Sequence, residues 1–175
     1  MTAIGDFGGE IELRDGGQAH VRALRPADEE LLHDALAQMS ERSVYYRFLS
    51  PLKKLPATLA RHLAAVDGDA RFALCATTDD PERILGVARY DRVAGTDIAE
   101  VAVAVVDDQQ RQGIGAQLLA RLAGVAREHE IRTFTLIVLP ENQTMLKLLR
   151  RLGWIHQARL RGGVYEITFA LTSEG

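Results

Sequence analysis

The chain has 175 residues, of which 47% are hydrophobic, and it carries a formal net charge of −3 with a pI near 6.0. The basic residues are scattered along it, which excludes the strongly basic surface that nucleic-acid-binding domains use. The apolar content is enough for one full core, and no repeat or low-complexity linker divides the sequence. We therefore expect one domain over residues 18–175, preceded by an N-terminal segment, residues 1–17, that can form a short strand.

The sequence contains no targeting signal and no membrane span. The first residues lack a positively charged start, and no apolar stretch approaches the about 20 residues that cross a bilayer. We therefore expect a cytoplasmic protein that has no membrane and no nucleic acid as partner. The single cysteine, Cys75, excludes an internal disulfide and is expected to be a small buried residue in a strand. The histidines show no spacing typical of metal ligands, so no metal is predicted, and they are His20, His33, His62, His129 and His156.

The first third of the chain predicts two strands and then three helices. The strands can pair through an Asp-Gly-Gly turn, and the helices begin at proline or serine residues that precede runs of apolar side chains at helical spacing. The expected strands are residues 10–13 and 20–24, and the expected helices are residues 26–39, 40–51 and 56–66.

The middle of the chain predicts three strands and a long helix. Residues 72–77 and 84–92 form a hairpin that leads into a strand over residues 98–106. In that strand Val101, Val103 and Val105 share one face, and alanines occupy the other. A glycine-rich turn follows, and an amphipathic helix then covers residues 114–130.

The last part predicts a strand, a helix and a final hairpin. Residues 133–139 are rich in β-branched side chains, and a helix then begins at Glu141-Asn142 and stops at Gly153. Residues 155–160 and 164–171 flank an Arg-Gly-Gly turn. This order of elements predicts a mixed α/β (α+β) domain.

The glycine-rich turn after the strand is built to hold a phosphate. Gly113 and Gly115 remove Cβ atoms that would keep an anion from the backbone, and the free amides at the start of a helix attract negative charge. No lysine or hydroxyl residue follows Gly115, which argues against a nucleoside triphosphate loop. Leu118 stands where a dinucleotide-binding fingerprint needs a third small residue.

Two blocks of sequence resemble the GNAT N-acetyltransferase superfamily. Gln110, Gly113 and Gly115 match the Gln/Arg-x-x-Gly-x-Gly/Ala pattern of its acetyl-CoA pyrophosphate loop. The second block matches an asparagine, helix and Leu-Gly-aromatic pattern, and it comprises Asn142, Met145, Leu148, Leu149, Leu152, Gly153 and Trp154. The resemblance implies the GNAT fold, a central, mostly antiparallel twisted sheet with a splayed pair of strands, flanked by about four helices.

Residues 23–154 are more specifically similar to the GNAT domain of bacterial protein-lysine acetyltransferases that modify acyl-CoA synthetases. This resemblance implies an enzyme that uses acetyl-CoA as cosubstrate and transfers the acetyl group directly to an amine, in the first instance a protein lysine. A small amine as acceptor is the nearest alternative. A catalytically silent regulator that binds acyl-CoA is the alternative outside enzymes. The sequence indicates neither the acyl-chain preference nor the oligomeric state.

The resemblance also implies roles for individual residues. Glu100, in an Ala-Glu pair at the start of the strand, is the expected base that deprotonates the amine, whereas the alternative is a carboxylate in solvent or paired with Arg89. Val103 and Val105 are expected to bind pantetheine through their main chain. Asn142 caps the following helix or binds pantetheine, and these two roles are compatible. The amides expected to hold the pyrophosphate follow Gln110 and belong to Arg111, Gln112, Gly113, Ile114, Gly115 and Ala116.

Two positions depart from the family pattern. Ile137 stands where amino-terminal acetyltransferases of the ribosomal-protein type often have a glutamate, so that base is absent. Leu149 replaces the tyrosine that protonates the departing thiolate in many members. A thiol pKa near 8.5 makes the thiolate a fairly good leaving group, so this loss slows turnover without abolishing it.

Overall fold

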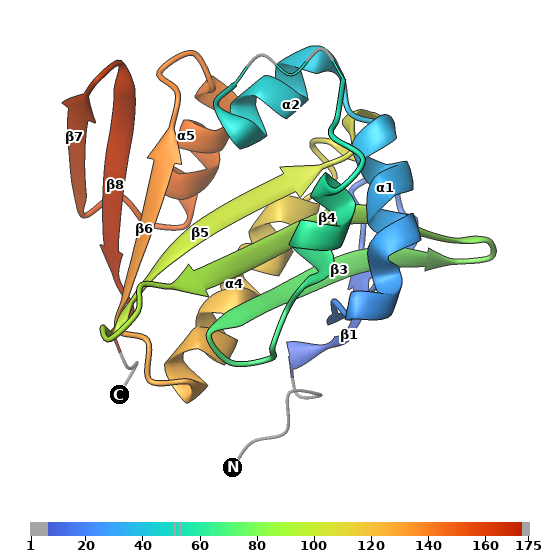
Figure 1. Cartoon of the computed structure of the whole chain (residues 1–175), viewed down its shortest axis with the longest axis horizontal. Coiled ribbons are helices and arrows are strands. Elements are labelled where there is room, and N and C mark those ends of the chain that lie inside the picture. The colour runs from blue at the N-terminus through green and yellow to red at the C-terminus, as the bar shows by residue number, and fades with distance from the viewer. Residues whose placement is uncertain (1–6, 51, 53, 173–175) are drawn as a thin grey trace.

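The structure is a computed structural model that describes residues 7–50, 52 and 54–172. Its centre is one eight-stranded sheet in the order β1-β2-β3-β4-β5-β6-β8-β7 (Figure 1). Every neighbouring pair is antiparallel except β5 and β6. The strands are β1 (Gly9–Glu12), β2 (Gln18–Ala23), β3 (Arg71–Asp79), β4 (Glu82–Arg92), β5 (Ile98–Val105), β6 (Thr133–Val138), β7 (Gln157–Arg161) and β8 (Val164–Ala170).

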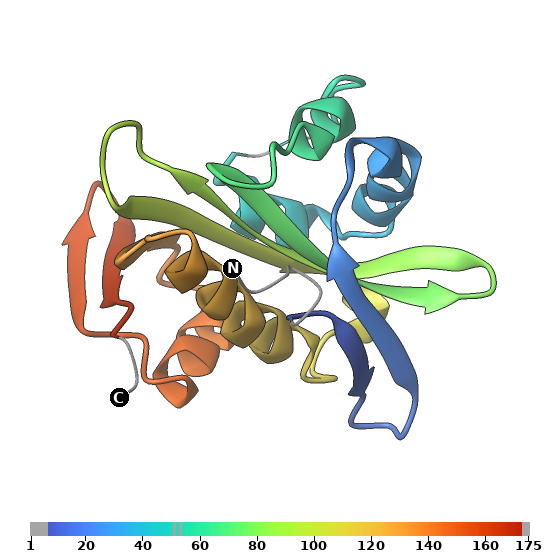
Figure 2. The same ribbon diagram turned by 90° about the horizontal axis from the view of Figure 1, so that it is seen from below.

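Helices cover both faces of the sheet (Figure 2). One face carries α1 (Glu29–Ala37), α2 (Glu41–Phe48) and α3 (Leu59–Ala64), and the other carries α4 (Ile114–Glu128) and α5 (Gln143–Arg151). Short 3-10 turns lie at η2 (Pro26–Asp28) and η3 (Asp107–Gln109). The mixed α/β fold with a mostly antiparallel sheet is therefore confirmed, with five α-helices in the described part of the chain.

Two cores follow from this layering. The larger one lies between the sheet and the α4–α5 layer, and it contains Leu118, Leu122 and Leu149 at 0% exposure. The smaller one lies under α1 and α3 and includes Cys75. Burial raises the pKa of Cys75 to about 12, so this thiol stays protonated and acts as a small apolar residue, as predicted.

The splayed pair of strands is β5 and β6. Their parallel ladder joins only three residues of each strand, with Glu100 opposite Thr135 as its last pair. Beyond that pair β5 stays bonded to β4 as far as Val105, while β6 stays bonded to β8 as far as Val138. The two strands therefore separate in the middle of the sheet and leave one side of β5 without a strand partner.

The structure refines several element boundaries. The first expected helix divides into η2 and α1, and α2 begins after Ser40, whose hydroxyl accepts a hydrogen bond from the Ser43 amide at 3.1 Å. Leu49, with φ +57°, ends α2 in a left-handed turn. The helix stop expected at Pro51 lies outside the described residues.

Candidate active site

A cleft of about 590 Å³ opens where β5 and β6 separate. Its floor is β5, and its walls come from α2, the first turn of α4, β6 and α5. We call it the central cleft. The residues expected to bind a cofactor gather around it, and those that line it are Val103, Val105, Gln110, Arg111, Gly113, Ile114, Gly115, Ala116 and Asn142.

Main-chain groups of β5 face this cleft. The Val106 amide donates to the Leu85 carbonyl on the β4 side at 2.9 Å. Because successive residues of an antiparallel strand point their main-chain groups alternately toward and away from the partner, Val105 and Val103 point theirs away from β4. The Val105 carbonyl confirms this direction, since it accepts a hydrogen bond from Gln110 Nε2 at 3.1 Å. The main chain of Val103 is thus presented to the cleft.

The first turn of α4 presents backbone amides at the end of the same strand. Gly113 precedes the helix with φ +87°, a left-handed conformation that glycine adopts without strain. No heavy atom outside its chain neighbours lies within 4 Å of where a Cβ would stand. The Gln117 amide donates a hydrogen bond back to the Gly113 carbonyl at 3.2 Å. The amides of Ile114, Gly115 and Ala116 have no intrahelical acceptor, as in the first turn of any helix.

Gly115 contributes close packing rather than an open approach. A Cβ on Gly115 would lie 3.3 Å from a methyl group of Leu148 on α5. A Cβ on Gly86 of β4 would lie 3.0 Å from a methyl group of Ile114 and 3.2 Å from the Ala104 carbonyl. The absence of a side chain at Gly86 therefore allows the start of α4 to pack closely against β4 and β5. This role was not identified from the sequence.

Side chains hold the loop before α4 in place. Gln110 Nε2 also donates to Ser43 Oγ of α2 at 3.2 Å. The Gln112 side chain turns away from the cleft and accepts from the Asp15 amide at 3.0 Å, and the Gln112 carbonyl accepts from the Arg14 amide at 3.3 Å. Gln112 is thus absent from the lining and instead ties the β1–β2 turn to the loop. This tie brings Arg14 to the rim of the central cleft.

The cleft carries a strong positive charge. Among the described residues that line it, the acidic one is Asp107, and its carboxylate accepts from the Ser40 amide at 2.9 Å. The basic residues come from the β1–β2 turn, α2, the loop before α4, and α5, and they are Arg14, Arg42, Arg47, Arg111, Lys147 and Arg151. Only Arg111 was singled out from the sequence. The spacing of Lys147 and Arg151, four residues apart on one helix, was the signal that could have identified two more.

Glu100 lies at the last paired position before the strands separate. Its side chain is exposed, whereas Ala99 and Val101 on either side are buried. Glu100 therefore faces the α1–α2 side of the sheet, together with Ala102 and Ala104. Arg89 does not pair with it, because the Arg89 guanidinium bonds Asp91 at 3.2 Å. Glu100 is thus a solvent-accessible carboxylate at the vertex of the two strands.

The remaining sequence candidates have clear positions. The Asn142 side chain accepts a hydrogen bond from the Met145 amide at 3.2 Å and so caps α5. Ile137 lines the cleft and is 52% exposed, so an apolar surface stands where amino-terminal acetyltransferases of the ribosomal-protein type often have a glutamate. Leu149 lies in the core at 0% exposure and does not reach the cleft.

The described residues contain no group of three His, Cys, Asp or Glu side chains arranged to hold a metal ion. No helix among them is long and apolar enough to cross a membrane.

Comparison with known proteins connects this geometry to a family. The model of the acetyltransferase (GNAT) family matches residues 31–154. The Acetyltransferase Pat of Mycolicibacterium smegmatis is 30% identical over 150 residues, which cover 84% of this chain and 45% of that protein. The chain therefore spans less than half of the length of that relative.

Solved structures show the same fold. The GNAT domain of S. lividans PAT superposes with a TM-score of 0.87 and 34% identity, over 97% of this chain and 99% of that one. The yncA protein of Salmonella typhimurium, solved with its cofactor acetyl-CoA, superposes with a TM-score of 0.71 and 16% identity, over 91% of this chain and 97% of that one. At 16% identity the second likeness concerns the fold alone.

Proposed function

Because this chain belongs to the acetyltransferase (GNAT) family, we propose that it transfers the acetyl group of acetyl-CoA directly to the amine of a protein lysine. The similarity to the GNAT domain of S. lividans PAT and to Pat of M. smegmatis supports this acceptor class. The observation that carries the proposal is the central cleft, where an unpaired strand edge, a helix N-terminus and a cluster of cations meet.

The residues of the cleft fit the chemistry of coenzyme A. Phosphates need positive charge and N–H donors, which the first turn of α4 and basic side chains of the cleft such as Arg111 and Arg151 offer. The amide groups of a pantetheine arm need main-chain partners, and Val103 presents an N–H and a carbonyl on the open edge of β5. The proposed cofactor-binding set therefore keeps its members except Gln112, which we assign to positioning the loop.

Bound acetyl-CoA would supply an acyl group activated as a thioester. Glu100 accepts a proton from the ammonium group of the acceptor, since a lysine with a pKa near 10.4 is protonated at neutral pH. As the new C–N bond forms, the C–S bond breaks, and the electron pair leaves with the CoA thiolate. We assign to the Val103 amide, on the open edge of β5, the hydrogen bond to the oxygen that gains charge. No described tyrosine replaces Leu149 on α5, so the thiolate takes its proton from solvent or from the amine.

The test is thiol release from acetyl-CoA over a panel of lysine-containing proteins and small amines, with mass spectrometry of each acceptor. The proposal expects release that depends on a lysine acceptor and an added mass of one acetyl group. Turnover with small amines but with no lysine-containing protein would show that the acceptor is a small amine and not a protein lysine. Binding of acetyl-CoA with no release on any acceptor would instead indicate a regulator that binds acyl-CoA.

A further inference from the structure

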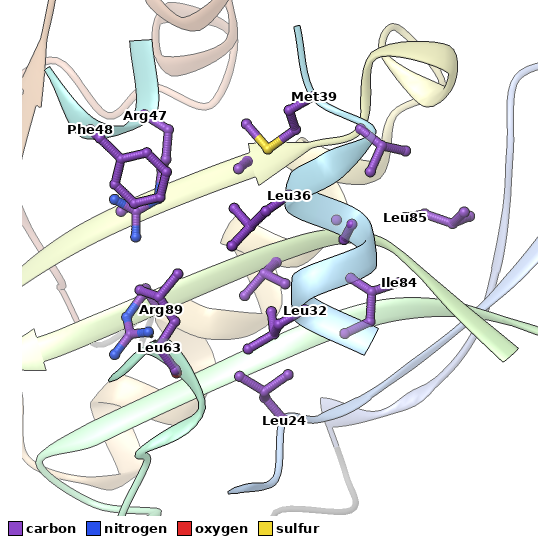
Figure 3. A pocket seen from close by; sticks show the side chains of 16 residues that line it. Leu24, Leu32, Leu36, Met39, Arg47, Phe48, Leu63, Ile84, Leu85 and Arg89 are labelled. Atoms are coloured by element: carbon purple, nitrogen blue, oxygen red, sulfur yellow. Dashed lines mark hydrogen bonds between the residues drawn. The ribbon is translucent and has the colours of Figure 1, made fainter. Parts of the chain in front are cut away.

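Arg47 of α2 lies where two cavities meet. It lines the central cleft, and it also lines an apolar cavity of about 40 Å³ between the α1–α3 layer and strands β4 and β5 (Figure 3). The two cavities share four lining residues, which are Met39, Arg47, Ala102 and Ala104. Arg47 therefore lies at the junction between the cleft and the space beneath α1 and α2.

The surroundings of Arg47 are apolar or positively charged. Its guanidinium carbon lies 4.7 Å from the centre of the Phe48 ring. The other charged residue that lines the apolar cavity is Arg89. Burial and the nearby Arg89 lower the pKa of Arg47 to about 10, although Asp91 acts in the opposite direction. Arg47 is still charged at neutral pH, in a place that disfavours its charge.

The carboxylate that favours the charge of Arg47, that of Asp91, is already engaged by other arginines. Asp91 accepts from Arg71 Nε at 2.9 Å and from Arg89 Nε at 3.2 Å. Arg89 also donates to the Leu63 carbonyl at 2.9 Å. Within the described part of the chain, no hydrogen bond or ion pair joins the Arg47 side chain to another residue. Two arginines thus share this aspartate, and the donors of Arg47 have no partner among the described residues.

The position of Arg47 relates it to the reacting end of the cleft. Arg47 lines both cavities together with Ala102, which is two residues from Glu100, the proposed base. Arg89, which also lines the apolar cavity, is paired in register with the same Ala102. The turn proposed to hold phosphates lies beyond Val105, at the other end of the same strand. An anion bound by Arg47 would therefore lie near the reacting amine and not at the diphosphate.

We propose that Arg47 binds a carboxylate of the acceptor, so that the acceptor of this enzyme carries a negative charge close to its reacting amine. The inference rests on the proposed transferase function and deepens it by naming the acceptor chemistry. A guanidinium recognises a carboxylate through two parallel hydrogen bonds, and partial removal from water strengthens them. The carboxylate belongs either to an acidic side chain next to a target lysine or to an amino acid with a free α-carboxylate.

The same charges disfavour polycationic acceptors. Six basic side chains line the central cleft, against one aspartate that is bonded to a backbone amide. A polyamine or an aminoglycoside would bring further positive charge into this environment. We therefore expect such amines to be poor acceptors even at high concentration.

Matched acceptors test the inference with the wild-type protein. One pair of capped peptides presents Lys-Asp or Lys-Asn, and a second pair presents lysine or lysine amide, so that each pair differs by one carboxylate. We expect at least a tenfold lower KM for the charged member of one pair, and the pair that responds identifies the source of the carboxylate. Equal values within both pairs would overturn the inference while leaving the transferase function intact.

Binding provides a readout independent of turnover. Calorimetric titration of both Lys-Asp and Lys-Asn peptides into the CoA-saturated protein should show the same preference. If thiol release fails with every acceptor but this preference appears, the proposed function fails and the anion site stands. Preference for succinyl-CoA over acetyl-CoA, with no acceptor preference, would assign Arg47 to the acyl group and overturn the inference.

Substitution separates recognition from structure. In Arg47→Met the KM values for the charged and the neutral acceptor of a pair should become about equal, whereas Arg47→Lys should retain part of the preference for the charged acceptor. The melting temperature of Arg47→Met should stay equal or rise, because the change removes an unpartnered charge from an unfavourable place. Arg61→Met is the control, since Arg61 is 76% exposed on α3 and outside both cavities. Loss of several degrees in Arg47→Met with an unchanged preference would show a structural role and overturn the inference.

Discussion

The two sides of the central cleft are built differently. The donor side consists of the β5 edge and the first turn of α4. It works through main-chain groups, which are available with any side chains of suitable size at these positions. The acceptor side consists of α2 and β6, together with Glu100, which lies outside the lining next to the lining residue Val101 of β5, and it works through particular side chains such as Glu100, Arg47 and Ile137. The donor side therefore indicates a cosubstrate class, whereas the acceptor side determines what receives the acetyl group.

This difference explains how far the sequence predicts the site. The turn at Gly113 is a local pattern, because a left-handed residue and a helix start are both set by neighbours in the chain. The surroundings of Arg47 are not local, since they depend on contacts with residues about 40 positions away on β4. A sequence with the same residues around Arg47 on α2 could have any residues at the facing positions of β4.

The fold shows the same limit. Alternating valines and alanines predicted β5, and helical spacing predicted α4, to within two residues. The link from Gln112 to the β1–β2 turn could not be predicted, because residues 97 positions apart meet only after the sheet forms. The gathering of basic residues around the cleft has the same origin, and in the sequence those residues are scattered.

The largest effect expected on the acceptor side is that of Glu100→Gln. We expect kcat to fall by about 100-fold or more, because the amide cannot accept the proton of the ammonium group. The Kd for acetyl-CoA should stay the same, since that ligand is assigned to the donor side. Steady-state kinetics and calorimetry on the same preparation measure both quantities. A full-rate variant would remove Glu100 as the base.

Attachment of the acceptor-side helices depends on a buried ion pair. Asp28 of η2 is 2% exposed, and its carboxylate accepts from Arg22 at 2.7 and 2.9 Å and from the Arg25 amide at 2.8 Å. We expect Asp28→Asn to lower the free energy of unfolding by about 3 kcal/mol, because it leaves Arg22, whose side chain is partly buried, less well paired. Urea unfolding at pH 7 measures this. Asp34→Asn, at an exposed position, should change the free energy little.

The same pair gives the stability a pH dependence. Burial alone would raise the pKa of Asp28, but hydrogen bonds from Arg22 and Arg25 outweigh it and hold this pKa below its usual value. The stabilisation is therefore complete above the unfolded-state pKa of about 3.9 and is lost as the pH falls through the folded-state value. As the pH is lowered from 6 to 3, the free energy of unfolding should fall less steeply in Asp28→Asn than in the wild type. Parallel curves of unfolding free energy against pH would contradict the assignment of this pH dependence to Asp28.

A smaller effect is expected when the donor-side turn is strained. Gly113→Ala places a Cβ on a residue in the left-handed conformation, which costs roughly 1–2 kcal/mol. We expect the amides of the first turn to shift in response and the affinity for acetyl-CoA to fall about tenfold. Gly95→Ala is the matched control, because Gly95 also has a positive φ, +75°, in open space but lies in the β4–β5 turn. An equal loss of affinity in both variants would indicate a general effect on the fold.

The smallest effect concerns a single cation of the cleft. Arg151→Ala should weaken acetyl-CoA binding a few-fold, and the difference should shrink at high salt, because exposed charges are screened. Arg150→Ala changes the neighbouring residue, which is also exposed but does not line the cleft, and should leave binding unchanged. Calorimetry at two salt concentrations distinguishes the two variants.

The most direct test of the donor side is hydrogen exchange of individual amides with and without acetyl-CoA. If main-chain groups hold the cosubstrate, the amides of Val103 and of residues 113–116 should become protected on addition of acetyl-CoA, while those of the β7–β8 turn should exchange as before. Binding of acetyl-CoA without protection at these amides would contradict the account.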